Sequence, residues 1–475
     1  MRRGSLVGPV LLILIGVVFL IRNIRPDLPL FDLLVAWWPV VLIAWGALRL
    51  VEILASYFRG RPLPRAGIHG GEWALIVLVT VFFMSVWSVK RWTHELPGKI
   101  RIGGVEVFGE AFDYPQPEMA VPASPQGRIV VENARGNTRI TGVEGAEVKV
   151  SGRKTVRALD RGAADRANDA ARLKVVRDGD GVRVVNEQDS LEGARISMDL
   201  EISAPRGSSI EFRGRYGDLE VKDIQGGVTV ESDNAGLRLE SVGGRVKANL
   251  RRSDIIRAIR VKGDVEIKGR GRDIEIEDVS GGVSIEGSYS GETLLRRVAR
   301  TVRFESPRTE IRAGALPGEM RITLSLLTIS QARGPLLVRA ETKDIQLADV
   351  TDTITINVER GDVEVRQPRT EFGRIEVKSG SGDIELALPA AARFTLHAST
   401  DRGDAVNEFD PRLKVEQDER RGAIHGNTGA GPDIRLQTRR GKVIVRKMTP
   451  AETSALLGRP PQAPPPPEPP RAVDQ

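Results

Sequence analysis

A repeat with a period of 18 or 19 residues, between about Asp218 and Ile322, constrains the fold more than any other feature of the sequence. Apolar residues return in five columns that keep register over six units. The central column is Val228, Val246, Val265, Val283, Val302 and Met320, at intervals of 18, 19, 18, 19 and 18. The column four residues earlier is Ile224, Val242, Val261, Val279, Val298 and Leu316. The other three are Val230, Ala248, Ile267, Ile285, Phe304 and Ile322; Leu219, Leu237, Ile256, Ile274, Thr293 and Ile311; and Val221, Leu239, Ala258, Ile276, Leu295 and Ala313.

The spacing within one unit predicts two short β-strands. Residues i and i+2 face the same side only in a strand, so Leu219/Val221 and Val228/Val230 mark one strand each. Turn formers such as Gly226-Gly227 separate them. A unit this short cannot bury its own apolar face, but stacked copies can. The repeat therefore predicts an all-β domain that is a parallel β-solenoid with 18–19 residues per rung. An antiparallel sandwich is the rival, but it gives no reason for so regular an interval.

The residues between the columns carry charges of both signs. Lys247 and Glu266, for example, would lie on neighbouring rungs. An exposed pair of opposite charges contributes about 0–1 kcal/mol. A nucleic-acid groove would present one sign of charge. The mixed charges therefore predict a solvated surface and no nucleic-acid partner. We find no aromatic or single-sign stripe in the sequence that would favour a ligand-binding face.

The absence of cysteine excludes disulfides, thiolate catalysis and cysteine-ligated metals. The formal net charge of +7 is modest for 475 residues and says little about partners. This length has room for two or three domains. All six tryptophans lie within residues 1–92, which indicates two parts of the chain in different solvents.

Three apolar runs predict an α-helical, three-span transmembrane region over residues 1–95. They cover Leu6–Ile21, about Leu33–Leu54, and Trp73–Val89. At 1.5 Å per residue the first run reaches roughly 24 Å, which is short but sufficient for a span. Tryptophans near the run ends suit the headgroup region. A cleavable signal peptide is disfavoured, because no small-x-small site follows the first run and two further runs do.

The first two runs repeat a proline-to-glycine pattern. Pro9-Val10-x-Leu12-Ile13-x-x-Gly16 recurs as Pro39-Val40-x-Leu42-Ile43-x-x-Gly46. With Asn23 and Trp38-Pro39 between the copies, the pattern resembles the transmembrane module at the N-terminus of bacterial cell-envelope stress proteins of the Lia type. The resemblance covers roughly residues 3–52 and implies a bacterial membrane protein.

Three spans place the two termini on opposite sides of the bilayer. The positively charged residues that flank the spans divide six to six, so their count does not decide the orientation. They are Arg2, Arg3, Arg49, Arg59, Arg61 and Arg65 on the N-terminal side, and Arg22, Arg25, Lys90, Arg91, Lys99 and Arg101 on the other. The N-terminal pair often dominates. We therefore expect a multi-pass protein of the bacterial cytoplasmic (inner) membrane with an extracytoplasmic β domain.

The remainder of the chain divides into four expected regions. Residues 96–126 predict a Pro-rich linker, because Glu110 to Gln126 is rich in Pro and Ala without a period. Residues 127–205 predict a β-rich capping region, with a helix over 158–173 that would cover the open end of the solenoid. Residues 206–448 are expected to form the solenoid itself. Residues 449–475, which contain Pro464 to Pro467, predict a Pro-rich disordered tail.

The last strands of the solenoid are expected to close its C-terminal end. These are Phe394/Leu396, Ile434/Leu436 and Val443/Val445. Residues from about 127 to 447 resemble the bacterial β-strand-repeat family that carries the label "putative adhesin" and has no known biochemical function. The residues that carry the resemblance are Gly217 to Val221, Gly361 to Val365, Ser381 to Pro389, Gly431 to Leu436 and Gly441 to Val443. Several units depart from the Gly-Asp turn, at Ile255, Glu292 and Glu310.

No residue pattern indicates chemistry. His69, His94, His397 and His425 lack ligand spacing, and no nucleophile elbow is present. Aspartates recur at turns and are expected there for turn formation, with stacked calcium sites as the alternative. They are Asp218, Asp254, Asp264, Asp273, Asp344, Asp362 and Asp383. We assign no catalytic, cofactor-binding or metal-binding residue and no cofactor.

These observations favour a non-enzymatic, membrane-anchored β-solenoid that acts as a scaffold, sensor or modulator in envelope homeostasis or stress signalling. The signalling role is partly what the family resemblance implies. The expected partners are the lipid bilayer and a protein of the membrane or envelope, with self-association of solenoids as a further option. An adhesin or glycan-binding surface module is the alternative. A β-helix polysaccharide lyase or hydrolase is the third hypothesis, and a cluster of three or more carboxylates in a groove would support it.

Overall fold

The computed structural model describes residues 101–102, 105–106, 109–186, 189–191 and 194–457. The three expected transmembrane spans, with His69 and His94, lie outside these residues. Within the described ranges, no helix is long and apolar enough to cross a membrane. The chain forms two compact units, Met1–Val107 and Phe108–Gln475. In the first unit the structure describes an antiparallel pair, β1 (Arg101–Ile102) with β2 (Val105–Glu106).

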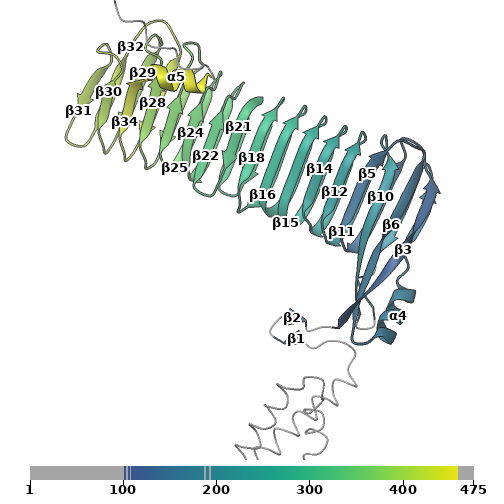
Figure 1. Ribbon diagram of the computed structural model, residues 1–475. Helices are drawn as coiled ribbons and strands as arrows, with labels where there is room; N and C mark the ends of the chain where they lie inside the picture. The colour runs from purple at the N-terminus through teal and green to yellow at the C-terminus, as the bar shows by residue number, and fades with distance from the viewer. Residues whose placement is uncertain (1–100, 103–104, 107–108, 187–188, 192–193, 458–475) are drawn as a thin grey trace, which may run out of the picture. The chain divides into compact units, whose positions relative to one another are not determined.

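The second unit is an elongated stack of rungs built from two ladders of hydrogen-bonded strands (Figure 1). In spatial order the first ladder consists of β7 (Lys174–Asp178), β8 (Gly181–Asn186), β4 (Arg128–Arg135), β11 (Ser209–Tyr216), β13 (Val228–Asn234), the first halves of β15 (Val246–Val261) and β16 (Val265–Val279), β17 (Val283–Tyr289), β19 (Val302–Ser306), β20 (Thr309–Ala313), β23 (Leu336–Thr342), β25 (Ile354–Arg360), β27 (Ile375–Ser379), β33 (Asp433–Thr438), β29 (Thr395–Thr400), β32 (Gly422–Asn427) and β31 (Lys414–Gln417).

The second ladder consists of β3 (Glu110–Pro122), β6 (Glu147–Ala158), β10 (Ala194–Pro205), β5 (Thr138–Val143), β12 (Leu219–Ile224), β14 (Leu237–Val242), the second halves of β15 and β16, β18 (Thr293–Val298), β21 (Leu316–Ile322), β22 (Leu326–Ser330), β24 (Asp344–Ala348), β26 (Val363–Arg366), β28 (Ile384–Leu388), β34 (Val443–Lys447) and β30 (Ala405–Glu408). The short β9 (Ser190–Leu191) pairs with the start of β10.

The repeat predicts the parallel part of the stack correctly. Val228, Val246, Val265, Val283 and Val302 are successive parallel partners, and all of them are buried. One continuous apolar core runs between the ladders from β4 to β34. Each inward Val, Ile or Leu contributes roughly 1.5–3 kcal/mol by leaving water, so the ladders are held together by the columns that the sequence displays.

The prediction of a parallel rung is wrong for the sixth unit, because the strands of this rung run in the opposite direction. After β19 the chain turns at residues 307–308, and β20 pairs with β19 in antiparallel register. β21 then pairs antiparallel with β18, so Met320 lies opposite Leu295. A second hairpin to β22 restores the original direction. The 18-residue spacing from Val302 to Met320 therefore continues the burial pattern, but it does not continue the parallel stack.

Along part of one edge of the stack, successive rungs turn through a residue in the left-handed region. Seven non-glycine residues have φ between 50 and 58°: Asp223, Ser241, Arg260, Asp278, Arg297, Gln331 and Asp349. Each directly precedes a buried residue, Ile224 and its equivalents. The series passes from Arg297 to Gln331 and omits the reversed rung, which is consistent with that rung entering the edge from the opposite direction.

The N-terminal end differs from the expected linker and cap. Residues 110–122, expected to be part of a linker over 96–126, form β3, because β6 offers this segment a full antiparallel ladder. The expected helix at 158–173 is shorter, α4 (Arg161–Ala170), and it packs on β6, β10 and β3 near one end of these long strands (Figure 1). The helix therefore packs against three strands of one ladder, whereas the sequence predicts a helix over the open end of the stack.

The C-terminal end also departs from sequence order. β33 pairs between β27 and β29, and β34 pairs between β28 and β30. Residues 389–431 therefore form the outermost rungs, and the chain then turns back to place β33 and β34 inside them. The expected disordered tail at 449–475 begins with a helix, α5 (Pro450–Leu456). A capping box forms where Glu452 N donates to Thr449 Oγ1 and Thr449 N donates to Glu452 Oε2. Arg446 also donates to both carboxylate oxygens of Glu452, which ties the helix to β34.

Candidate functional site

The two histidines that the structure describes, His397 and His425, do not form a recognisable catalytic or metal-binding site. His397 and His425 are antiparallel partners on β29 and β32, so the structure brings them together. His425 Nε2 lies 3.7 Å from Oε1 of the exposed Glu416. Within the described ranges, no group of three or more His, Asp or Glu side chains is arranged to hold a metal ion. These histidines therefore lie on the outside of the terminal strands.

The turns at the other edge of the last rungs form a regular main-chain ladder. Each is joined to the next turn by one N–H to C=O bond. The bonds run from Lys343 N to Arg360 O at 2.9 Å, from Gly361 N to Ser381 O at 2.9 Å, from Gly382 N to Arg440 O at 2.8 Å, from Gly441 N to Arg402 O at 3.0 Å, and from Gly403 N to Arg420 O at 3.2 Å. The five residues whose carbonyl oxygens accept these bonds are therefore stacked, rung upon rung.

Glycine is required at the centre of these turns. Gly382 has a φ of +146°, and a Cβ there would meet the carbonyl oxygen of Gly361 at 2.1 Å. Gly441 and Gly403 show the same close approach to the glycine of the preceding rung, at 2.2 and 2.0 Å. Only a residue without a side chain allows rungs to approach this closely at this backbone conformation. The glycines therefore fix the spacing of the residues beside them.

Four of the five stacked positions before these turns are arginine. The basin formed here has a volume of about 780 Å³. We call it the arginine basin; its lining residues are Arg360, Arg402, Arg420, Arg421, Arg439 and Arg440, with Glu359, Asp401, Gly380 and Ser381. The six guanidinium groups come from four turns that are up to 80 residues apart in sequence.

The arginines of the basin lack side-chain counter-charges. Among the described residues, none of the six has a side-chain ion pair or hydrogen bond. Many basic residues elsewhere in the stack are paired: Arg257 Nε lies 3.0 Å from Glu275, and Lys268 Nζ lies 2.9 Å from Glu286. Strands in a ladder are about 4.8 Å apart, and like charges directly opposite one another destabilise it. The basin therefore concentrates positive charge that an anion can neutralise.

The cationic series continues as a buried lysine on the adjoining rung. Lys343 is only 6% exposed, and its Nζ donates to the carbonyl oxygens of Thr323 and Leu324. Burial lowers the pKa of Lys343, because the charged form loses its hydration. This lysine holds the β21–β22 hairpin in place and, unlike the arginines, does not face solvent.

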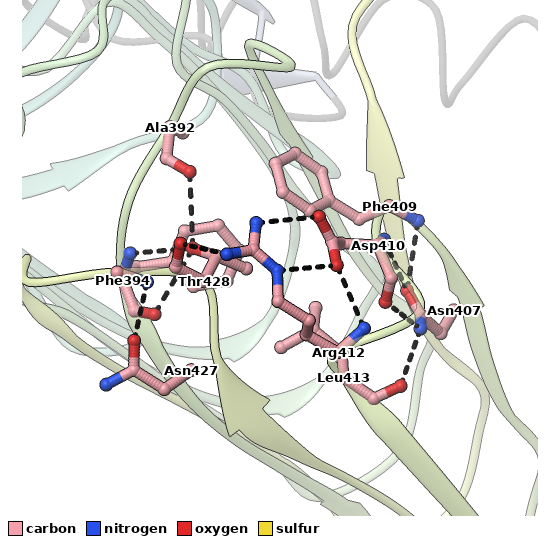
Figure 2. A network of polar contacts seen from close by, with 10 residues as sticks. Ala392, Phe394, Asn407, Phe409, Asp410, Arg412, Leu413, Asn427 and Thr428 are labelled. Atoms are coloured by element: carbon pink, nitrogen blue, oxygen red, sulfur yellow. Dashed lines mark hydrogen bonds and ion pairs between the residues drawn. The ribbon is translucent and has the colours of Figure 1, made fainter.

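Residues 389–431, which we call the excursion, supply Arg402, Arg420 and Arg421. A polar network stabilises this segment (Figure 2). Arg412 donates to both oxygens of Asp410, from Nε at 3.0 Å and from its terminal nitrogen at 2.9 Å. Its other terminal nitrogen donates to the carbonyl oxygen of Thr428 at 2.8 Å. The bonds that Asp410 accepts from the side chain and the backbone N–H of Arg412 lower the pKa of Asp410 to about 2. Arg412 therefore ties the loop before β31 to Thr428, the residue that follows β32.

Two further contacts fix the excursion to the stack. Phe409 packs edge-on against Phe394 at a centroid distance of 5.2 Å, and both rings are buried. Gln417 accepts from Ala405 N and donates to Gly403 O, both at 3.2 Å. This amide joins the β31–β32 hairpin to the turn that carries Arg402. The arginine basin is therefore built on a rigid frame.

Sequence reasoning missed this site. The sequence shows no single-sign stripe in any one unit, because the basin draws on turns separated by β33, β34 and the excursion. A signal was present in the dipeptides Arg360-Gly361, Arg402-Gly403 and Arg440-Gly441. An arginine directly before the turn glycine, repeated in three turns, predicts stacked arginines once those turns are known to be neighbours.

The turn aspartates have a structural role. Oδ1 of Asp218, Asp264 and Asp273 accepts the backbone N–H of Gly236, Gly282 and Glu292 respectively, at 2.9–3.0 Å. Each acceptor lies one rung before its donor. The carboxylates therefore join successive turns, as the expectation of turn formation requires.

Comparison with known proteins identifies the domain. The Toastrack DUF4097 family matches residues 189–446, which is more than half of the chain. The chain belongs to this family. The LiaF transmembrane domain matches residues 7–106, so the Toastrack domain follows a membrane domain, and contact with a lipid bilayer is implied. Both matches agree with the resemblances seen in the sequence. No curated protein matches the chain.

Three of the solved structures that are similar to this Toastrack chain have adhesion names. A "putative cell adhesion protein" from Clostridium sporogenes is 10% identical, with 70% of this chain and 100% of that chain covered and a TM-score of 0.16. A "putative adhesin" from Bacteroides fragilis is 12% identical, covers 71% and 97%, and has a TM-score of 0.17. Another from Parabacteroides distasonis is 9% identical, covers 72% and 98%, and has a TM-score of 0.21.

Proposed function

We propose that this protein is a non-enzymatic, membrane-anchored β-solenoid that serves as a scaffold, sensor or modulator in bacterial envelope homeostasis or stress signalling. The supporting observation is the order of the two matched domains, with a LiaF transmembrane domain at residues 7–106 and a Toastrack domain after it at residues 189–446. The turn ladders of the second unit give it an extended surface whose positions are fixed rung by rung. Such a surface suits contact with a protein partner in the membrane or envelope.

The location proposed is the cytoplasmic membrane of a bacterium, with three spans and the β domain outside. The experiment that tests it adds a protease to intact spheroplasts and follows a tag placed after Gln475. Loss of the tag from sealed cells supports an extracytoplasmic domain. A tag protected until lysis places the domain in the cytoplasm. That result overturns the adhesin and glycan hypotheses and leaves a role as an intracellular scaffold.

An adhesin or ligand-binding surface is the second candidate. The arginine basin favours it, because a concave site of one dominant charge is the feature that such a module needs. A lyase or hydrolase has less support: the basin contributes two carboxylates, Glu359 and Asp401, beside six arginines. Binding of isolated envelope fractions to the protein, compared before and after removal of the basin charges, separates the surface module from the scaffold.

A further inference from the structure

We propose that the arginine basin binds a multivalent phosphate, either free or carried by a larger molecule. The basin lies on the turn edge of the last rungs, around Arg402 and Arg440, and no known property of the chain assigns a ligand to it. This proposal goes beyond the scaffold role and does not depend on which side of the membrane the domain occupies.

The stacking of guanidinium groups favours phosphate over a carboxylate. Arg440, Arg402 and Arg420 come from consecutive turns, as their carbonyl bonds to Gly382, Gly441 and Gly403 show. A guanidinium is a planar fork that pairs with two oxygens at a time. A phosphate monoester presents three acceptor oxygens, so one group can join arginines of neighbouring rungs. A carboxylate presents two oxygens in one plane and reaches fewer of them.

The charge of the lining points to more than one phosphate. Six arginines against Glu359 and Asp401 leave a formal charge of +4. A phosphate monoester carries about −1.5 to −2 at pH 7, so two or more groups are needed to neutralise the basin. A di- or triphosphate, or a run of phosphodiesters, supplies that charge within one ligand.

The lining also excludes recognition of an apolar ring. Apart from the charged residues it contains Gly380 and Ser381, and it offers no aromatic face on which a base or sugar could stack. Ser381 occupies the one stacked position that is not arginine. Its hydroxyl can donate to an anion without adding charge. The basin is therefore suited to phosphate oxygens and indifferent to the rest of the ligand.

The test measures binding of inorganic tripolyphosphate to the full-length protein in nanodiscs of phosphatidylcholine, by calorimetry at low and high salt. We expect binding that weakens as salt rises, because exposed charges are screened. Orthophosphate should bind more weakly than tripolyphosphate. Citrate, which carries three carboxylates, should also bind more weakly, and citrate binding as tight as tripolyphosphate would overturn the preference for phosphate.

The decisive variant is Arg402→Gln/Arg440→Gln, with Arg270→Gln/Arg272→Gln as its matched control. The control arginines are also exposed and lie at the mid-strand bend of β16, outside the basin. Both variants lose two positive charges. The basin variant should bind tripolyphosphate at least about tenfold more weakly, because charge-assisted hydrogen bonds are lost. Equal weakening in the two variants would mean that only diffuse charge acts, and would overturn the site.

A variant that is expected to bind tripolyphosphate more tightly distinguishes loss of the site from loss of folding. Asp401→Asn removes a negative charge from the lining and should tighten tripolyphosphate binding several-fold. A structural role for Asp401 does not predict tighter binding. The proposal is also wrong if tripolyphosphate raises the melting temperature of wild type and of Arg402→Gln/Arg440→Gln equally, since a ligand stabilises the state to which it binds.

The source of the phosphate is settled by competition. Vesicles that contain phosphatidylglycerol are added to the nanodisc protein with bound, labelled tripolyphosphate, and vesicles of phosphatidylcholine alone serve as the control. Displacement by phosphatidylglycerol vesicles alone supports a lipid headgroup as the natural ligand. Retention of the label against both vesicle types supports a soluble or polymeric phosphate.

Discussion

The backbone N–H of Asp383 donates a 2.8 Å hydrogen bond to Oδ1 of Asp362 on the preceding rung. Asp362 N donates in the same way to Asp344 at 3.0 Å, and Lys442 N donates to Asp383 at 2.7 Å. Three consecutive carboxylates therefore join four turns, directly beside the glycines that fix the rung spacing. The Gly-Asp dipeptide of this repeat is thus one unit: the glycine permits close approach, and the aspartate holds the next rung.

The first prediction concerns Asp362. Replacing it with alanine removes the acceptor for Asp383 N and should lower the free energy of unfolding by about 1–2 kcal/mol, as at a helix N-cap. Asp362→Asn keeps an Oδ1 acceptor and should lose less than half of that. The urea midpoint of the full chain in detergent measures both. Equal losses would show that the hydrogen bond across the rungs is not the cause.

The second prediction separates steric clash from backbone strain at glycine. Gly382 and Gly145 have φ values of +146° and +150°, but a Cβ at Gly145 meets nothing within 4 Å. Gly145→Ala should cost about 1–2 kcal/mol from strain alone. Gly382→Ala adds a contact of 2.1 Å with the carbonyl of Gly361, and should cost about 2 kcal/mol more. Similar midpoints for the two variants would contradict tight rung spacing at Gly382.

The sequence predicts the strands and register of the repeated rungs. It does not predict the places where the chain reverses direction. The columns through Val228 and Ile224 are explicit, and the parallel rungs follow from them. The reversed rung keeps the same apolar spacing, because burial alternates with a period of two residues in either direction. β3 is Pro-rich, so its composition is typical of a linker, and only its antiparallel partner β6 makes it a strand.

The arginine basin was hidden from sequence reasoning for a related reason. Its charges are neighbours only because residues 389–431 fold back, so that Arg440 and Arg402 come from adjacent turns in reversed chain order. A capping motif such as Thr449 with Glu452 is local, and could have been read from the sequence. Contacts between distant turns depend on strand order, which a single sequence does not display.

The third prediction tests the left-handed edge. Asp223 has a φ of 56°. Asparagine and aspartate tolerate this region, whereas a β-branched residue does not. Asp223→Val should therefore lower the free energy of unfolding by about 1–2 kcal/mol, and Asp223→Asn should change it by less than about 0.5 kcal/mol. A valine variant as stable as wild type would mean that the turn relaxes to an ordinary conformation.

The fourth prediction is a pH dependence of α5. Arg446 donates to both oxygens of Glu452, and together with Thr449 N lowers the pKa of that carboxyl from 4.5 to about 2. The unfolded segment takes up a proton near pH 4.5, and the folded one near pH 2. Between these values the unfolded state binds more protons, so the stabilisation is complete above pH 4.5 and is lost as the pH falls towards 2.

Hydrogen exchange of the α5 amides, corrected for the intrinsic rate at each pH, measures this loss locally. Protection in wild type should fall between pH 4.5 and 2. Glu452→Gln cannot titrate, so it should give weaker protection at neutral pH and little further change on acidification. Glu419→Gln, which removes an exposed carboxylate of the β31–β32 turn, is the control and should behave as wild type. Because Asp410 also titrates near pH 2, a loss of protection spread over β29–β32 but absent from α5 would assign the acid sensitivity to the Asp410–Arg412 network, and the prediction for Glu452 would be wrong.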